Sequence, residues 1–362
     1  MVSLVLVGGG HSHLFALEAF ARHPQARVRL RVVSPTALST YSGMMPGVLG
    51  GAYALREAQI DLARLARRAA AELILSTVVA LDPATRHLSL ADGRHLPYDL
   101  ASFDIGSLSA PLARATDAPL IAMKPFAEAA AHLERALAAP RPRVVIGGGG
   151  AAGVELAWAI ATRLRDRLGS SVTVCDRAAS PLATRGAATQ RRALHALRAA
   201  GIAWRGGVEI TAVEGDAVRL ADGGAIPATL VINASGAAGA ALFAAAGLPV
   251  DGRGFLRVGD DLRCAPHPEL FASGDCAVLD SYPRLPRAGV YAVRQGPLLA
   301  HNLRAAIDGR PLRRFRPRRN VLALLNTADG AAILSYGRIA YHGRAAWWLK
   351  NAIDRRFVAR FG

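Results

Sequence analysis

The sequence predicts an α/β fold in which one strand–helix–strand unit occurs twice. Each unit opens with an apolar strand rich in β-branched residues, at positions 2–7 in the first unit and 143–146 in the second. A glycine-rich turn follows at 8–10 and again at 147–150, and a helical stretch comes next. Two units with the same order of parts rarely arise by chance, so we expect two similar domains, each built on a parallel sheet.

The remaining elements of the first unit follow in order. Residues 12–22 are predicted as a helix, 28–33 as a second strand and 73–81 as a third. Asp92-Gly93 predicts a hairpin turn, because this pair readily adopts the positive φ angles of tight turns. A strand at 100–105 then closes the unit.

The second unit repeats this order. A helix is predicted at 153–168 and strands at 171–175, 208–213 and 230–234, with the hairpin pair Asp222-Gly223 before the last strand. In both units the helix lies between successive strands, as a right-handed crossover requires. The units are separated by a helix predicted at 126–139 and a proline-containing link. We expect a first domain at 1–115 and 250–318, a second at 116–249 and a C-terminal segment at 319–362.

Composition narrows the class of protein. The formal net charge is +17, yet no zinc-finger spacing, RNA-binding motif or basic recognition helix occurs, so we expect no nucleic-acid partner. No run of about 18 uncharged apolar residues predicts a membrane span. Cys175, Cys264 and Cys276 form no C-x-x-C pair and no leader pattern opens the chain. A cytoplasmic protein without a metal site is expected.

The first glycine turn, Gly8-x-Gly10-x-x-His13, matches a dinucleotide-binding fingerprint with one departure. His13 stands where the pattern has its third glycine, although the free amides and dipole of a helix start still favour a phosphate. The imidazoles of His11 and His13 add possible donors. Ser34 ends the next strand, where the pattern has a ribose-binding acid.

The second turn carries the full fingerprint, Gly148-x-Gly150-x-x-Gly153, and Asp176 ends the following strand. An acid there repels a 2′-phosphate, which favours NADH over NADPH. Arg177 lies next to it and Arg185 follows closely, and these side chains attract the same phosphate, so the choice stays open. The fold class predicted is therefore α/β with two Rossmann-like dinucleotide-binding domains and a small C-terminal segment.

A third element follows both units. A short apolar strand ends in Gly274-Asp275. A Gly-Asp pair in this position resembles the two-dinucleotide-binding-domain flavoproteins, the glutathione reductase-like superfamily. The resemblance implies FAD on the first domain, NADH or NADPH on the second, and a hydrogen bond from Asp275 to the ribityl chain or pyrophosphate of FAD.

Within that superfamily the chain looks like the pyridine nucleotide-disulfide oxidoreductase-type proteins that are fused upstream of selenide, water dikinase in some organisms. These are relatives of type II NADH dehydrogenases, and the resemblance covers nearly the whole chain. The runs that carry it are 7–13, 41–47, 60–62, 104–107, 124–125 and 291–296.

The resemblance implies a site. The loop 41–47 would line the flavin ring, with Met44, Pro46 and Lys124 nearest the chemistry; a surface lysine is the alternative for Lys124. The implied FAD contacts are Gly8, Gly10, His11, Ser12, His13, Ser34, Val78, Gly106, Lys124, Gly274, Asp275, Gly289 and Val290. The implied NAD(P)H contacts are Gly148, Gly150, Gly153, Glu155, Asp176 and Gly236.

The cysteines favour one type of chemistry. Relatives that reduce disulfides use a close cysteine pair, which this sequence lacks, so direct transfer from flavin to an acceptor is expected. A quinone-like acceptor is the first hypothesis. Reduction of a small sulfur or selenium species is the second, and a non-enzymatic flavin-bearing redox sensor or binding protein is the third.

Residues 344–361 are predicted as an amphipathic helix. A basic helix with tryptophan is typical of segments that lie on anionic membranes. The alternatives are that it covers the protein's own core or a homodimer interface. Its apolar side is expected to hold Ala345, Trp348, Leu349, Ala352, Ile353, Phe357 and Phe361, and its charged side Lys350, Arg355, Arg356 and Arg360.

Overall fold

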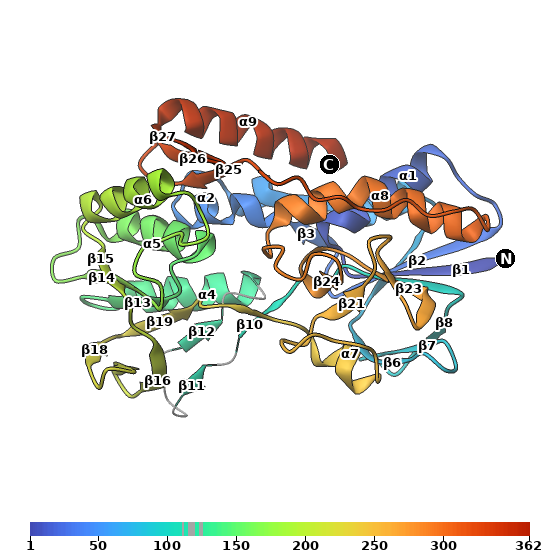
Figure 1. Cartoon of the computed structure of the whole chain (residues 1–362), viewed down its shortest axis with the longest axis horizontal. Helices are drawn as coiled ribbons and strands as arrows, with labels where there is room; N and C mark the ends of the chain where they lie inside the picture. Colours follow the sequence, from blue (N-terminus) through green and yellow to red (C-terminus); the bar gives the residue numbers. More distant parts are fainter. Residues whose placement is uncertain (111, 115–119, 123–125) are drawn as a thin grey trace.

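The computed structural model describes residues 1–110, 112–114, 120–122 and 126–362. Its chain forms two α/β halves that lie side by side, with a C-terminal sheet and helix along one edge of both (Figure 1). Each half contains its own parallel sheet, as the repeat predicted. The prediction of an α/β protein with two Rossmann-like domains is confirmed, while the residue limits of the domains remain predictions.

The first sheet has the strand order β22-β23-β9-β1-β2-β5, and every neighbouring pair except β22–β23 is parallel. Its central strands are almost entirely buried because helices cover the sheet, which explains their continuous apolar runs. The strands are β1 (Val2–Val7), β2 (Val28–Ser34), β5 (Glu72–Leu75), β9 (Leu100–Phe103), β22 (Arg263–Cys264) and β23 (His267–Ala272).

Two helices far apart in sequence pack closely against each other in this half. They are α1 (His11–Arg22) and α8 (Gly289–Ile307), and both point their first turns toward the centre of the molecule (Figure 1). A Cβ at Gly296 would lie 2.3 Å from a ring carbon of Phe15, so only glycine permits this approach. The close contact places the start of α8 next to the first glycine turn.

The second sheet is entirely parallel, in the order β12-β19-β13-β14-β15. Its strands are β12 (Leu120–Ala122), β13 (Arg143–Gly147), β14 (Ser171–Asp176), β15 (Ala203–Gly206) and β19 (Leu230–Asn233). The helices of this half are α4 (Phe126–Ala138), α5 (Ala151–Leu164) and α6 (Ala187–Ala199).

Each half also carries a small antiparallel sheet that contains the predicted hairpin turn. Gly93 and Gly223 have φ angles of +85° and +84°, as their hairpin turns require. The strands are β6 (Val78–Asp82), β7 (His87–Leu90) and β8 (His95–Pro97) in the first half, and β16 (Ile210–Glu214), β17 (Ala217–Leu220) and β18 (Ala225–Pro227) in the second, where β11 (Ala113–Arg114) joins β16.

Two predicted elements differ from the structure. The strand expected at 73–81 is two strands, because β5 pairs with β2 in the parallel sheet while β6 turns away to pair with β7. The N–H of Ser76 marks the break by donating to Ser34 O. The helix expected at 153–168 is α5, which begins two residues earlier, after Gly150 as its N-cap, and ends at Leu164.

The chain crosses between the halves twice, and the crossings pair as the antiparallel strands β10 (Leu108–Ser109) and β20 (Ala237–Ala238). The C-terminal sheet is β25 (Ala323–Asn326), β26 (Ala332–Tyr336) and β27 (Ile339–Gly343), followed by α9 (Arg344–Phe361). Within the described ranges, no helix is both long and apolar enough to cross a membrane. The smaller elements are β3 (Leu38–Thr40), α2 (Met45–Leu49), β4 (Gln59–Asp61), α3 (Leu62–Arg68), α7 (Ala241–Ala245), β21 (Leu256–Val258) and β24 (Ala277–Leu279), with 3₁₀ turns at Ser42–Met44, Leu55–Ala58 and Gly274–Cys276.

Candidate functional site

The first glycine turn joins β1 to α1 and lies against the end of β9. Gly8 has a φ of +94°, and a Cβ on it would lie 2.4 Å from Asp104 O. The Gly10 N–H donates to the same carbonyl at 3.2 Å. The backbone geometry therefore requires glycine at position 8, whereas at position 10 a Cβ would meet the Asp104 carboxyl group.

His13 has a different role from the one expected. Its ring is fully buried, with Nδ1 2.7 Å from Gly8 O and Nε2 2.9 Å from the Ser102 hydroxyl. The carbonyl requires the proton to be on Nδ1, so Nε2 accepts from Ser102. Burial lowers the pKa of His13 to about 4, and the ring is neutral. The prediction that this imidazole contacts phosphate is wrong, because the ring ties the turn to β9.

Ser34 ends β2, as expected, but its hydroxyl is used locally. Its Oγ donates to Thr36 O at 2.9 Å and accepts from the Thr36 N–H at 3.4 Å. No carboxylate stands at this position to bind a ribose. Val78 lies nearby at the start of β6, where its side chain is part of the first half's apolar core.

The Gly-Asp pair lies beside the first turn. Gly274 has a φ of +67°, and a Cβ there would lie 2.6 Å from a carboxylate oxygen of Asp104. Asp275 follows in the 3₁₀ turn, and the buried hydroxyl of Ser273 has no hydrogen-bond partner. Gly106, with a φ of +71°, ends the neighbouring β9 segment. This glycine-lined cradle, with the unpartnered Ser273 hydroxyl in the adjoining segment, fits the pyrophosphate and ribityl part of FAD.

The segments expected around the flavin ring meet at His11. Its ring lies 5.2 Å from that of Tyr41 and 5.6 Å from that of Phe357, and Tyr41 stacks on Phe357 at 4.5 Å. A Cβ at Gly289 would lie 3.5 Å from the His11 ring. Val290 follows in the first turn of α8, partly buried against the core. Helix α9 thus contributes an aromatic side chain that the sequence did not predict at this point.

Two residues of the loop 41–47 that were expected next to the flavin ring are buried in the protein. Met44 is completely buried in an apolar cluster with Met45, Tyr53 and Ala58, and Pro46 is buried as well. The expectation that the Met44 side chain faces a reacting group is therefore wrong, since it supports the loop by packing. Lys124, the third residue placed near the chemistry, lies outside the described residues.

The second turn matches its fingerprint closely. Gly148 has a φ of +112°, and a Cβ at Gly153 would lie 1.8 Å from Gly148 O. Gly150 caps the N-terminus of α5, and nothing lies within 4 Å of the place where its Cβ would be. An open backbone at a helix start is the arrangement that a dinucleotide pyrophosphate needs.

Asp176 lies at the end of β14, as predicted. Its carboxylate accepts the N–H groups of Gly149 and Ala178, which fix its orientation beside the turn. Arg177 pairs with Glu209 at 3.7 Å. Gly236, at the end of the β19 segment, accepts the Ala110 N–H at 3.1 Å and so belongs to the crossing between the halves.

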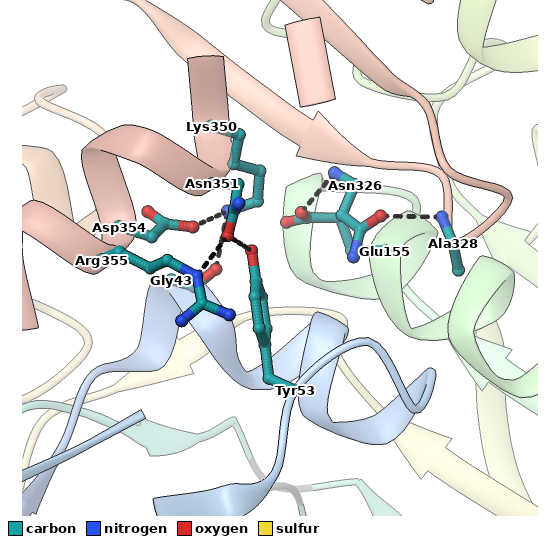
Figure 2. Close-up of polar contacts among 9 residues, drawn as sticks. All are labelled: Gly43, Tyr53, Glu155, Asn326, Ala328, Lys350, Asn351, Asp354 and Arg355. Atoms are coloured by element: carbon teal, nitrogen blue, oxygen red, sulfur yellow. Dashed lines mark hydrogen bonds and ion pairs between the residues drawn. The ribbon is translucent and has the colours of Figure 1, made fainter. Parts of the chain in front are cut away.

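A buried polar group lies where the two halves and the C-terminal segment meet (Figure 2). Lys350 of α9 is 5% exposed, and its Nζ donates to Gly43 O at 2.7 Å and to Asp354 Oδ2 at 2.8 Å. Tyr41 also hydrogen-bonds Asp354. A buried ammonium thus holds the loop 41–47 against α9.

Glu155 of α5 faces this group from the second half (Figure 2). Its Oε1 accepts the Asn326 N–H at 2.8 Å, and the nearby charge of Lys350 lowers its pKa only partly. Burial is the larger effect and raises the pKa of Glu155 to about 7. Burial also raises the pKa of Asp354. We call Lys350, Asp354, Glu155 and Tyr41 the junction group.

The roles of Lys350 and Asp354 were not predicted from the sequence, because the charged residues of α9 were expected on its solvent side. The available signal was their i,i+4 spacing in line with Ala346, which is also buried. The predicted apolar side is divided: Phe357 and Phe361 pack on the first half, while Trp348, Leu349 and Ile353 are 63%, 41% and 42% exposed. The expected apolar face therefore packs on the protein only at its C-terminal end.

The three cysteines do not have the properties of redox-active thiols. All three are buried, unpaired thiols, and burial raises their pKa values to about 11 for Cys175 and Cys264 and about 12 for Cys276. Protonated thiols are poor nucleophiles, so none of them suits a thiol relay.

The profile of the pyridine nucleotide-disulphide oxidoreductase family matches residues 2–302. The chain belongs to this family. FAD is the cofactor of this family, and NADH or NADPH is its co-substrate. The match includes both glycine turns, Asp275 and the start of α8.

Similar proteins include demethylphylloquinone reductase NdbB of Synechocystis sp., which is 32% identical over 215 residues, 58% of this chain and 52% of NdbB. The chain thus spans about half the length of this curated relative. Among solved structures, the sulfide:quinone oxidoreductase of Aquifex aeolicus has a TM-score of 0.83 at 18% identity, with 100% of this chain and 91% of that chain covered. The NDH2 of Plasmodium falciparum, in complex with NADH, has a TM-score of 0.82 at 13% identity, with 99% and 96% covered. The narrower resemblance to proteins fused with selenide, water dikinase stays a prediction.

The ion pair in the junction group predicts a large effect on stability. Replacing Lys350 with Met leaves Asp354 buried without its cation, which should cost about 3–5 kcal/mol in the free energy of unfolding measured by denaturant titration. The matched control is Arg355→Met on the same helix. Arg355 pairs with Glu57 in solvent, and its loss should cost about 0–1 kcal/mol. Equal losses for the two variants would contradict the assignment, and Lys350→Met with Asp354→Leu should recover most of the stability.

Proposed function

We propose that this oxidoreductase passes electrons from NADH or NADPH through FAD directly to a quinone. The observation that carries the proposal is the junction group, which places proton-holding side chains at the loop 41–47 while the cysteines remain buried and protonated. A quinone takes up two protons with its two electrons, whereas disulfide reduction in this family needs a cysteine pair. The names of NdbB and of the Aquifex aeolicus protein, both of which concern quinones, support the same choice.

In this proposal FAD lies across the first half. The cradle at Gly8, Gly10 and Gly274 holds its pyrophosphate, Asp275 bonds its ribityl chain, and the ring reaches His11. When bound, FAD supplies the two-electron chemistry between the nucleotide and the acceptor. The aromatic pair at Tyr41 and Phe357 keeps water from one side of this region.

The nucleotide lies on the second turn in this proposal. The start of α5 faces its pyrophosphate and Asp176 bonds its ribose hydroxyls. We propose a preference for NADH, because the Asp176 carboxylate stands at the ribose position and Arg177 is paired with Glu209. Both conditions weaken binding of a 2′-phosphate.

The junction group supplies the protons. Glu155 has a pKa of about 7 and exchanges a proton near neutral pH. Lys350 Nζ, held by Asp354 and Gly43 O, presents a fixed positive charge beside the loop 41–47 and favours the anionic reduced form of an acceptor. Tyr41, whose pKa is raised chiefly by burial, stays protonated and orients Asp354 by its hydrogen bond.

A bilayer surface is the source of acceptor that we propose. The outer face of α9 exposes Trp348, Leu349 and Ile353, and its arginines flank these side chains. Exposed tryptophan beside basic residues is typical of helices that lie on anionic lipid. The inner face of the same helix holds Lys350, so this contact would bring lipid-dissolved quinone close to the junction group.

An acceptor screen tests the proposed function. Steady-state oxidation of NADH is measured with soluble ubiquinone and menaquinone analogues, and in parallel with selenite and polysulfide. We expect quinones to give rates at least about tenfold higher, as direct two-electron acceptors of this site. Higher rates with selenite or polysulfide would favour the sulfur or selenium alternative, and no turnover with any acceptor would favour a redox sensor.

The FAD assignment predicts a cofactor loss. Asp275→Ala should be purified with little or no flavin, because the carboxylate that orients the ribityl chain is gone. The flavin content per chain is measured from the visible absorbance of the purified protein. Asp280→Ala is the matched control, since Asp280 lies on the surface in a pair with Arg257 and should leave flavin unchanged. Stoichiometric flavin in Asp275→Ala would refute the assignment.

Proton supply by Glu155 predicts a pH profile. Its acid form is present below about pH 7 and is lost as the pH rises through 7, so the kcat for quinone reduction should fall over that range. Glu155→Gln should lower kcat by about 10²-fold and remove this decline. Glu214→Gln, which alters an exposed carboxylate paired with Arg219, is the control. An unchanged decline in Glu155→Gln would exclude the role.

The outer face of α9 predicts lipid binding that can be removed without disturbing the fold. Trp348→Ser, Leu349→Ser and Ile353→Ser together should weaken co-sedimentation with anionic phospholipid vesicles by at least about tenfold. Substitution suits this test better than deletion of α9, because deletion would remove the buried Lys350 as well. Leu168→Ser, at a residue that is 94% exposed after α5, controls for lost surface apolarity. Equal binding by all forms would contradict a membrane role for α9.

A further inference from the structure

The first turn contains a carboxylate in the place where a phosphate is normally expected. Asp104, at the end of β9, is 3% exposed, and its Oδ2 accepts the N–H of Ser12 at 2.7 Å and of His13 at 3.3 Å. These amides belong to the first turn of α1, whose dipole favours an anion. The anion that occupies this helix start is therefore part of the protein.

Asp104 also lies inside the cradle assigned to the pyrophosphate. A Cβ at Gly10 would lie 2.2–2.4 Å from the carboxyl atoms of Asp104, and a Cβ at Gly274 would lie 2.6 Å from its Oδ1. The carboxyl thus reaches both glycine segments that are expected to contact FAD. A dianionic pyrophosphate that enters this cradle comes next to the Asp104 side chain.

Among the described residues, none of the groups that shift the pKa of Asp104 is a cation. Asp275 acts on it from the 3₁₀ turn as a like charge, and Cys276 is a buried, protonated thiol. On α1, His13 is neutral and His11 directs its ring toward Tyr41. From α8, Ala292 lies beside Gly274, and Gln295 Oε1 accepts the Gly274 N–H at 2.7 Å; neither side chain is ionisable. Burial, which outweighs the amide bonds, raises the pKa of Asp104 to about 7.

We propose that FAD binds to the form of the protein in which Asp104 is protonated, so that binding takes up one proton from solvent onto this carboxyl. The neutral carboxyl then donates a hydrogen bond to a pyrophosphate oxygen in place of repelling it. In the absence of FAD, the ionised carboxylate fills the amide pocket as an internal substitute for the phosphate. This inference rests on the proposed location of FAD.

The sign of the effect follows from this linkage. Below about pH 7 Asp104 is already protonated, so FAD affinity is constant there. Above it the proton must be taken up on binding, and the dissociation constant should rise about tenfold per pH unit until the pKa of the complex is reached.

The test uses the holoenzyme and does not depend on turnover. Purified protein is diluted into a series of buffers between about pH 6 and about pH 9. The dissociation constant of FAD at each pH is obtained from the fluorescence of released FAD. We expect the wild type to lose affinity above pH 7 and Asp104→Asn, which keeps an acceptor for Ser12, to bind with little dependence on pH. Asp216→Asn, at an exposed carboxylate, should behave as the wild type.

A second measurement needs no variant. Calorimetric titration of FAD into flavin-depleted protein at pH 8, in two buffers of different ionisation enthalpy, should detect close to one proton taken up per FAD. No uptake, or an equal pH dependence in the wild type and Asp104→Asn, would overturn the proposal. If FAD is not held at this turn, Asp104→Asn will leave its affinity unchanged at every pH and Asp275→Ala will retain flavin, so the two failures are distinguishable.

Discussion

The hydrogen bond from Lys350 Nζ to Gly43 O is the contact on which the arrangement of the centre depends. It joins the last helix to a loop of the first half. Because the Lys350 ammonium is buried, it would be strongly destabilising without a charged partner, and Asp354 is that partner. The Asn326 N–H bonds Glu155 from the same C-terminal segment. Helix α9 and its sheet therefore link two halves that the repeat alone would leave side by side (Figure 1).

The two glycine turns occupy equivalent positions in the repeat, but different side chains surround the start of the helix in each. In the second turn Gly153 permits the close approach of helix and strand, and Asp176 is available at the strand end. In the first turn His13 takes the place of that glycine, and its ring hydrogen-bonds Gly8 O. The Asp104 carboxyl group accepts the Ser12 N–H at the start of α1. The first turn is thus better fastened to its sheet and carries its own negative charge, which agrees with a tightly held cofactor whose binding is linked to a proton.

Much of the fold follows from patterns within the sequence. The apolar runs, the glycine turns and the two Asp-Gly hairpins predicted both halves, because each of these patterns is local and has one favoured geometry. The break between β5 and β6 was not predicted, since β-branched residues continue through it and only the pairing partner changes. The two glycine turns lie between a strand and a helix, as expected, for the same local reason. The buried positions of Lys350, Asp354 and Asp104 were not predicted, because their surroundings are formed by segments far apart in the sequence. Met44 is buried by contacts of the same kind.

In the proposed reaction, electrons pass from the nucleotide through flavin directly to a quinone, and no thiol takes part. Anaerobic rapid mixing of the holoenzyme with NADH, followed by mixing of the reduced protein with a menaquinone analogue, measures both steps by the visible absorbance of the flavin. The account predicts that the absorbance bleaches at a rate no slower than turnover and recovers at a rate no slower than turnover, also after the cysteines are replaced by alanine or serine. A flavin that NADH fails to bleach, or a reduced flavin that the quinone fails to reoxidise, would contradict it.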